Sequence, residues 1–204
     1  MLEIFDAIKH RRSIRKYQAK SVPKVLIEDV LLAAGWAPSA HNAQPWRFIV
    51  LSDNHSKRDL AQRMAESWAL DNAKDGSKIE GELLLSRVER FANAPILILA
   101  CLTTEGMIKQ PDEERQKVER DLAIESLGAA MQNLLLAAHA KGLGACWFCA
   151  PAFCKETVRK LLKIPNEVEP AALVTMGYLA ESPAIPNRKQ LGDYCFNGVW
   201  GNKF

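Results

Sequence analysis

The sequence has no apolar stretch long enough to cross a bilayer, because its longest purely hydrophobic run is about the length of a strand. It opens on Met1, Leu2 and Glu3, without the layout of a signal peptide. Neither sign of charge dominates, since 27 Lys and Arg against 24 Asp and Glu residues give a net charge of +3. We therefore expect a cytoplasmic protein with no membrane partner and no nucleic-acid partner, because nucleic acid requires a concentrated basic stripe.

The motifs of several enzyme classes are also missing. No G-x-G-x-x-G follows an expected strand and no G-x-x-x-x-G-K-[ST] is present, which argues against a Rossmann dinucleotide site and a P-loop. There is no G-x-S-x-G and no H-E-x-x-H. The four histidines, His10, His41, His55 and His139, are scattered. If the chain is an enzyme, we expect a bound organic cofactor to supply its chemistry.

The five cysteines are an odd number, which disfavours a disulfide framework. Cys146 and Cys149 have the spacing of a redox or zinc pair, but they lie in an apolar, strand-like context without a second ligand pair nearby. Buried structural thiols are the favoured interpretation over metal or redox duty, and no metal site is expected.

At 204 residues the chain is long enough for one α/β core, and residues 1–204 are expected to form a single domain. Apolar periodicity predicts helices at 2–10, 23–36, 55–70, 78–92, 121–140 and 154–163, and strands at 46–51, 94–100, 145–149 and 171–178. Residues 71–77 are expected to be a polar break, 104–115 a polar loop and 183–204 an irregular tail. The helix at 121–140 is apolar almost all the way round, which places it at the centre of the molecule or in an extended interface.

Residues 11–15 place three guanidinium groups and a hydroxyl at an expected helix end: Arg11, Arg12, Ser13, Ile14 and Arg15. One interpretation is an exposed basic patch that the helix dipole favours. The other is a phosphate site, because phosphate requires several convergent donors and arginine supplies them in planar pairs. Arg188 is a candidate to complete such a site.

A second polar segment lies between an expected helix and strand. Ser39, Asn42 and Gln44 can present hydroxyl and amide groups to the edge of a ring, although the same residues are common in capped turns. His41 is the only titratable residue of this loop and is either a surface hydrogen-bonding group or a catalyst. Together the two segments indicate a flat, heteroatom-rich, phosphorylated ligand, for which flavin mononucleotide (FMN) is the best candidate.

At these residues the chain resembles the nitroreductase family of flavoenzymes. The matching segments follow one another in the family's order: Arg-Arg-Ser-Ile-Arg at 11–15, Pro-Ser-x-x-Asn-x-Gln-Pro-Trp at 38–46, Asn-Ala-Pro at 93–95, the helix end and turn at 133–147, Val-Thr-Met-Gly-Tyr at 174–178, and the tail at 187–201. The resemblance implies an α+β fold with a central, mainly antiparallel sheet flanked by helices. It also implies an interlocked homodimer with the helix at 121–140 in its core and FMN at the subunit interface.

The resemblance further implies roles for individual residues. Arg11, Ser13 and Arg15 would hold the phosphate and ribityl chain, Ile14 would lie among these cofactor contacts, and Arg12 would lie beside the ring. Arg188 would reach the phosphate from the tail. Contacts to the isoalloxazine would come from the opposite subunit, through Pro38, Ser39, Asn42 and Gln44. Cys149 and Ala150 stand where many members have Glu-Gly, so that only backbone contacts are implied there. The candidates for the substrate pocket are His41 and Asp71.

Within the family, residues 10–180 look most similar to the C-terminal flavin domain of the bifunctional protein that makes the deazaflavin coenzyme F-420. The shared segments are Cys-Trp-Phe at 146–148, Phe-Cys at 153–154 and residues 162–170. The leading hypothesis is FMN-dependent hydride transfer from NADH or NADPH to a small acceptor by ping-pong kinetics. Reduction of an unsaturated deazaflavin precursor is the alternative reaction. A flavin-binding module without turnover is the alternative from another class.

Overall fold

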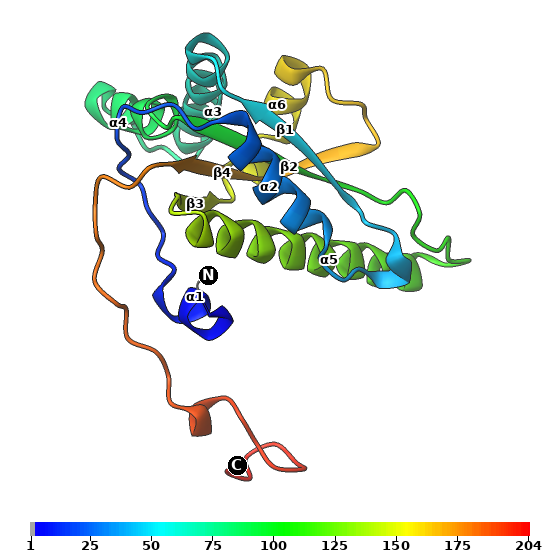
Figure 1. Ribbon diagram of the computed structural model, residues 1–204. Coiled ribbons are helices and arrows are strands. Elements are labelled where there is room, and N and C mark those ends of the chain that lie inside the picture. The colour runs from blue at the N-terminus through cyan, green and yellow to red at the C-terminus, as the bar shows by residue number, and fades with distance from the viewer. Residues whose placement is uncertain (1–2) are drawn as a thin grey trace.

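The structure is a computed structural model that describes residues 3–204. Its four strands form one antiparallel sheet between two layers of helices (Figure 1). They are β1 (Trp46–Leu51), β2 (Ile96–Thr103), β3 (Gly144–Phe148) and β4 (Val168–Gly177), in the spatial order β1-β2-β4-β3. Every pair of neighbouring strands is antiparallel. The predicted α+β fold with a central, mainly antiparallel sheet flanked by helices is therefore confirmed.

Strand β2 is buried on both faces, which explains its unbroken apolar sequence. Side chains of a strand alternate between the two faces of the sheet. Ile96, Ile98, Ala100 and Leu102 belong to a core that includes α2 (Lys24–Gly35) and α5 (Glu113–Ala140). Leu97, Leu99 and Cys101 face a second core, to which α3 (Asn54–Lys74), α4 (Gly81–Ala92) and α6 (Lys155–Leu162) contribute.

Helix α5 is longer than the sequence predicted. The expected start at residue 121 is wrong, because the helix begins at Glu113 and includes residues assigned to a polar loop. Asp112 caps this end by accepting a hydrogen bond from the amide of Arg115 at 2.9 Å, and two glutamates occupy the first turn, where the helix dipole favours them. The predicted helix 121–140 is the apolar part of α5, and Ile124 on it is 42% exposed in the single chain.

Smaller differences concern α3 and α4. The predicted polar break at 71–77 begins later, because α3 continues to Lys74, and α4 begins at Gly81 rather than 78. Asp53 caps α3 by accepting from the amide of Ser56 at 2.8 Å. Strand β4 begins at Val168, three residues before its predicted start. These helices and strands leave the order of the predicted elements unchanged.

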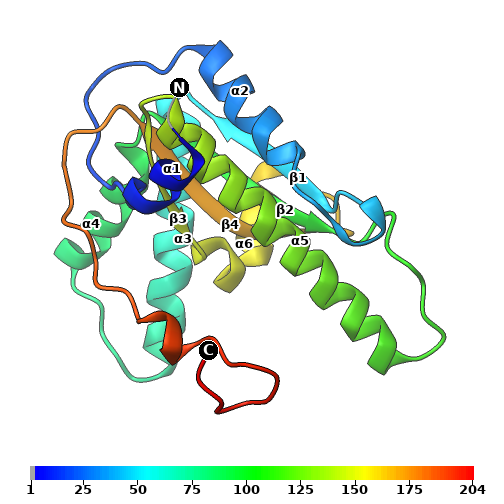
Figure 2. The ribbon, with the colours of Figure 1, turned by 60° about the horizontal axis from the view of Figure 1, so that its bottom comes forward.

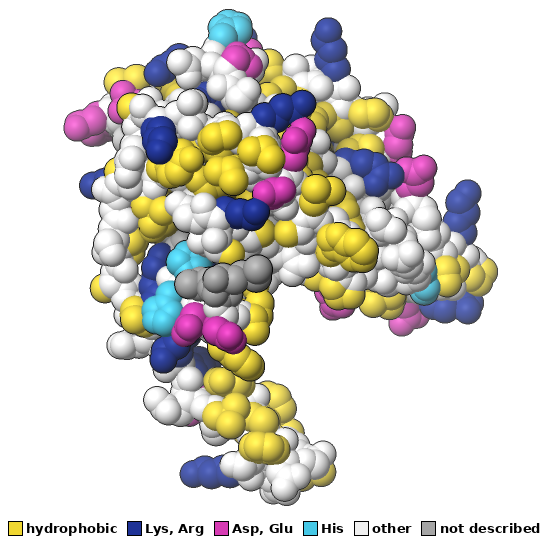
Figure 3. Space-filling model, viewed as in Figure 1, with side chains coloured by type: hydrophobic (Ala, Val, Ile, Leu, Met, Phe, Trp, Pro, Cys, Tyr) yellow, Lys and Arg dark blue, Asp and Glu magenta, His cyan; other side chains and the backbone are white. Residues whose placement is uncertain are grey.

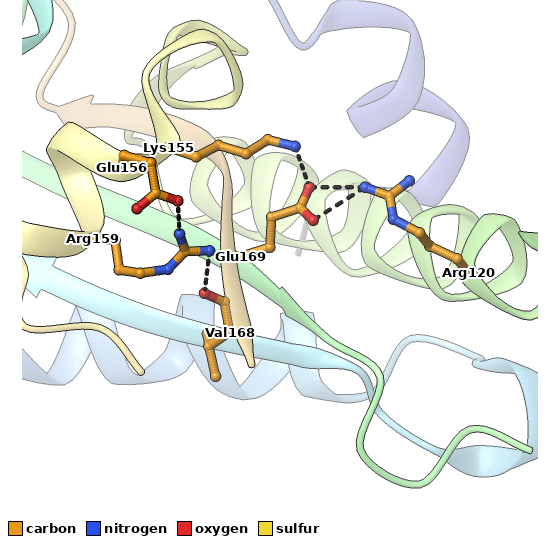
Figure 4. A network of polar contacts seen from close by, with 6 residues as sticks. All are labelled: Arg120, Lys155, Glu156, Arg159, Val168 and Glu169. Atoms are coloured by element: carbon orange, nitrogen blue, oxygen red, sulfur yellow. Dashed lines mark hydrogen bonds and ion pairs between the residues drawn. The ribbon is translucent and has the colours of Figure 1, made fainter. Parts of the chain in front are cut away.

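A network of charged side chains ties α5, α6 and β4 together (Figure 4). Glu169 on β4 accepts hydrogen bonds from Lys155 at 2.5 Å and from Arg120 at 2.9 Å. Arg159 pairs with Glu156 and donates to the carbonyl of Val168 at 3.5 Å. The contacts join three elements, and we assign them to stability.

The two ends of the described chain lie outside the main helix and sheet layers. The short helix α1 (Ile4–His10) lies against α5, and only Ala7 on it is buried. After β4 the chain runs past α1 and extends away from the body, with one short 3-10 turn, η3 (Leu191–Asp193) (Figure 2). Two further 3-10 turns, η1 (Ala40–Asn42) and η2 (Ala150–Phe153), precede β1 and α6.

Candidate functional site

The arginine segment is fixed beside the sheet by its own backbone. Ser13 forms a parallel bridge with Ala145 on β3, and the amide of Ile14 donates to the carbonyl of Ala145 at 3.0 Å. The Ile14 side chain is buried directly over Gly144. A Cβ on residue 144 would lie 2.7 Å from Ile14, so the close approach requires glycine.

Tyr17 holds the other end of this segment. Its hydroxyl donates to the carbonyl of Ile14 at 2.5 Å and lies 2.6 Å from the hydroxyl of Thr175 on β4. Burial raises the pKa of Tyr17, so that the phenol stays protonated and keeps its donor. The backbone between residues 13 and 17 is therefore attached to both β3 and β4.

We call Arg11, Arg12 and Arg15 of this segment, together with Arg188 of the tail, the cationic cluster. Among residues 3–204 no ion pair involves any of the four. Burial, together with the charges of Arg12 and Arg188, lowers the pKa of Arg11. The charge of Arg188 in the tail therefore acts on Arg11. Arg11 and Arg12 are half-buried, whereas Arg15 and Arg188 are exposed, and the nearby carboxylate of Glu181 accepts from the backbone amides of Arg15 and Lys16. Half-buried guanidinium groups that form no ion pair favour a bound anion.

A cavity of about 270 Å³ opens beside this cluster, between α1, the end of α5 and the chain after β4. Its polar lining comes from Arg11, Arg12, Ser182 and two histidines, His10 and His139. Burial lowers the pKa of His139, and the charges of Arg11, His10 and Arg12 lower it further. All of the charged groups in the lining are cationic or can become so, which again favours an anionic ligand.

The second predicted segment, residues 38–44, has an unusual backbone. His41, Asn42 and Gln44 have φ angles of 56°, 52° and 48°, which residues other than glycine seldom adopt. Among the contacts that hold this conformation, the amide of Gln44 donates to the Ser39 hydroxyl at 3.1 Å, and the amide of Ala40 donates to the Ser126 hydroxyl at 3.1 Å. Such strain is retained where the surroundings fix it, and it is concentrated at functional sites.

The two segments do not meet within one chain. Residues 38–44 contact α5 near Ser126, whereas the cavity beside the arginines is lined by His139 of the same helix. Thirteen helical residues separate these points by about 20 Å, at about 1.5 Å per residue. Figure 1 shows the loop before β1 and helix α1 near opposite ends of α5. Within one chain the two segments therefore meet α5 at different places along its length.

A further cavity of about 390 Å³ lies between α3, α4 and η2, and it brings Asp71 together with Ala150. Cys149, which precedes η2, is exposed. Sequence reasoning missed Trp68 and Phe153 as lining residues and gave no definite role to Arg87. The Arg87 guanidinium lies 3.5 Å from the centroid of the Trp68 ring, a cation–π contact. In the sequence, only the four-residue spacing of Trp68 and Asn72, which places them on one face of a helix, could have indicated that this helix lines a cavity.

The remaining predictions concern thiols and metals. Cys101, Cys146 and Cys154 are buried and all five cysteines are free. Burial raises the pKa of Cys101 and of Cys154, each to about 11, as expected for inert structural thiols.

In the part of the chain that the structure describes, no group of His, Cys, Asp and Glu side chains is arranged to hold a metal ion. Across residues 3–204, no helix has the length and hydropathy of a membrane span.

Comparisons with known proteins show the family and the fold. The sequence model of the nitroreductase family matches residues 8–178. A protein of Methanothermobacter thermautotrophicus, provisionally named NADH dehydrogenase/NAD(P)H nitroreductase, is 33% identical over 184 residues, which are 89% of this chain and 80% of the other.

Two solved structures have the same fold. A nitroreductase family protein from Clostridium novyi NT has a TM-score of 0.67 and 26% identity, covering 100% of this chain and 97% of its own. A BluB-like flavoprotein from Clostridium difficile 630 has a TM-score of 0.79 and 21% identity, covering 97% and 99%. Given the family match over most of its length and the relative at 33% identity, the chain belongs to the nitroreductase family.

Proposed function

We propose that this chain is an FMN-dependent oxidoreductase that passes hydride from NADH or NADPH to a small acceptor. The observation that carries the proposal is the cationic cluster, whose guanidinium groups form no ion pair within residues 3–204 and two of which, those of Arg11 and Arg12, line a cavity with positive groups. In this proposal Arg11, Ser13 and Arg15 hold the phosphate and ribityl chain, next to the backbone of Ile14. Arg188 approaches the phosphate from the tail, and Arg12 lies beside the ring.

The proposal includes a homodimer, because Pro38, Ser39, Asn42 and Gln44 would contact the ring of the flavin held by the other chain. The separation of these residues from the arginines along α5 supports this arrangement. Exposed apolar side chains also support it. Phe5 on α1 is 80% exposed, and Trp200 in the tail is 89% exposed. The tail projects from the body with apolar groups on its surface (Figure 3). A second copy would bury them.

FMN would supply the redox chemistry, accepting hydride from the nicotinamide and giving it to the acceptor. The residues of the chain would bind and orient: guanidinium groups fix the phosphate, and the strained loop fixes amide groups at the ring edge. Backbone groups of Cys149 and Ala150 would contact the ring from the other side. The nicotinamide donor and the acceptor would bind one after the other at the same position on the flavin, and this order of binding requires ping-pong kinetics.

The 390 Å³ cavity is proposed to receive the acceptor, with Asp71 and Arg87 as its charged groups. Arg87 favours an anionic planar acceptor such as an unsaturated deazaflavin precursor, which is the second candidate substrate. Lys74 does not add to this charge, because it pairs with Asp71 at 2.8 Å. Parallel assays with a quinone, a nitroaromatic and the deazaflavin precursor separate these substrates; turnover of only the first two would exclude the second candidate.

The cofactor assignment is tested by FMN retention. The Arg11→Ala/Arg15→Ala variant should lose FMN on dialysis, since each charged hydrogen bond contributes about 1–3 kcal/mol. Arg58→Ala/Arg63→Ala, which removes two exposed arginines of α3, is the matched control and should retain it. Unchanged retention in the first variant would refute the phosphate site. Bound flavin that no reduced nicotinamide bleaches would instead favour a binding module without turnover.

A further inference from the structure

His41 is held by a carboxylate that the fold buries for it. Its Nε2 lies 3.2 Å from Oε2 of Glu119, whose side chain is only 6% exposed. Glu119 is on the first part of α5, 78 residues further along the chain. The His41 backbone has a φ of 56°, so the loop takes an unfavourable conformation where the ring meets this carboxylate. A surface histidine would need neither the strain nor the buried partner.

The carboxylate itself is fixed from the other side. Its Oε1 accepts a hydrogen bond from Nε2 of Gln110 at 2.9 Å, and the amide of Gln110 donates to Oε1 of Gln116 at 3.0 Å. The hydrogen bond from Gln110 is the largest effect on the pKa of Glu119 and lowers it. Burial raises this pKa, but His41 and the amide of Ile108 lower it further, so that it stays below its ordinary value. Glu119 is therefore ionised at neutral pH and accepts the Nε2 proton of His41. Because Nε2 is engaged, the second nitrogen, Nδ1, is the one left to exchange a proton.

The place of His41 in the chain gives this arrangement a use. It lies between Ser39 and Asn42, two residues proposed to contact the flavin of the other chain, and its side chain is 36% exposed. No other hydrogen bond to the ring is found within residues 3–204. At the start of β1, Arg47 donates to the Gln44 carbonyl and pairs with Glu105 at 2.6 Å, so its charge is already partnered.

We propose that His41 of one chain is the proton donor to the acceptor bound by the other chain, and that Glu119 is the residue that positions it. The inference rests on the proposed function. A quinone takes one hydride, supplied through the flavin from the nicotinamide, on one carbonyl oxygen. The other oxygen then holds the electron pair and takes the proton from Nδ1, giving the hydroquinone. The imidazole is left neutral, keeps its Nε2 proton towards Glu119, and regains the Nδ1 proton from solvent.

The test compares two acceptors on the FMN-loaded protein. Menadione needs a proton, whereas ferricyanide takes single electrons and no proton. In His41→Gln the ratio of kcat with menadione to kcat with ferricyanide should fall about 100-fold, the lower end of the usual contribution of a general acid. Glu119→Gln should lower the ratio less, and His55→Gln on the exposed start of α3 should leave it unchanged. The solvent deuterium isotope effect on menadione reduction should be present in the wild type and change in His41→Gln.

Two outcomes would overturn the proposal. One is an unchanged menadione-to-ferricyanide ratio in His41→Gln, with the wild-type isotope effect. The other is an equal loss with both acceptors, which would show that the residue only supports the loop. FMN content and bleaching by NADH or NADPH are measured first for each variant. A wild-type protein that binds no FMN, or whose flavin is not bleached, would refute the proposed function. If the wild type binds FMN and is bleached, the ratio of kcat with menadione to kcat with ferricyanide tests the role of His41.

Discussion

Replacing Gly144 by alanine should disturb both the fold and the proposed phosphate site, because this glycine faces Ile14 in the middle of the arginine segment. The new Cβ would lie 2.7 Å from Cβ and Cγ2 of Ile14 and 2.8 Å from Cγ1. Carbon atoms pack at about 3.5–4.0 Å, so the segment must move by roughly 1 Å. Such a shift would break the 3.0 Å hydrogen bond from the amide of Ile14 to Ala145.

The cost of this change can be estimated. Overpacking costs about 1–3 kcal/mol, and the lost hydrogen bond about 1 kcal/mol, so Gly144→Ala should lower the free energy of unfolding by about 2–4 kcal/mol. For a chain of this size we expect Tm to fall by roughly 4–16 °C. Thermal unfolding followed by circular dichroism measures the shift, and FMN titration should show weaker binding. Gly81→Ala, where a Cβ meets nothing within 4 Å, is the control. A Gly144→Ala protein with unchanged Tm and unchanged FMN affinity would refute the reasoning.

Three further predictions concern stability and assembly. Lys57→Met should lower the free energy of unfolding by about 1–3 kcal/mol in urea denaturation, because the buried Lys57 ammonium donates to the carbonyls of Ala94 at 2.7 Å and Pro95 at 3.1 Å. Burial raises the pKa of Glu169, but its hydrogen bonds with Lys155 and Arg120 outweigh this effect and leave the pKa lowered. Glu169→Gln should therefore lower the free energy of unfolding by about 1 kcal/mol above pH 4.5, and this loss should vanish as the pH falls through the pKa of the folded state. An equal loss at every pH would contradict this prediction. Sedimentation velocity should give the mass of two chains for the full protein, and a smaller dimer fraction when residues 183–204 are deleted; a full chain that sediments as a monomer would exclude the shared site.

The sheet and the order of the helices could be predicted because their signals are local. The apolar run at 94–100 indicated a strand buried on both faces, and β2 is such a strand. The start of α5 was missed although Asp112 and the two glutamates after it are a typical helix beginning. Its first two turns are mostly charged and exposed, so apolar periodicity could not reveal them.

The candidate site was only partly accessible from the sequence. The arginine segment and residues 38–44 stand out by composition, but their separation along α5 depends on the tertiary fold. The partner of His41 could not be predicted, because Glu119 lies 78 residues away in a helix turn between the predicted loop at 104–115 and the predicted helix start at 121. Trp68, Arg87 and Phe153 come together from three elements, and no single segment carries their pattern.

The most direct test of the central claim is the difference in affinity between FMN and riboflavin. The two ligands share the ring and the ribityl chain and differ only in the phosphate. If the cationic cluster binds that phosphate, the apoprotein should bind FMN at least about 10-fold more tightly than riboflavin. A tenfold difference in affinity corresponds to about 1.4 kcal/mol, and two charged hydrogen bonds of about 1.5 kcal/mol each exceed this value. Arg11→Ala/Arg15→Ala should bring the two affinities close together. Equal binding of FMN and riboflavin by the wild type would contradict the account.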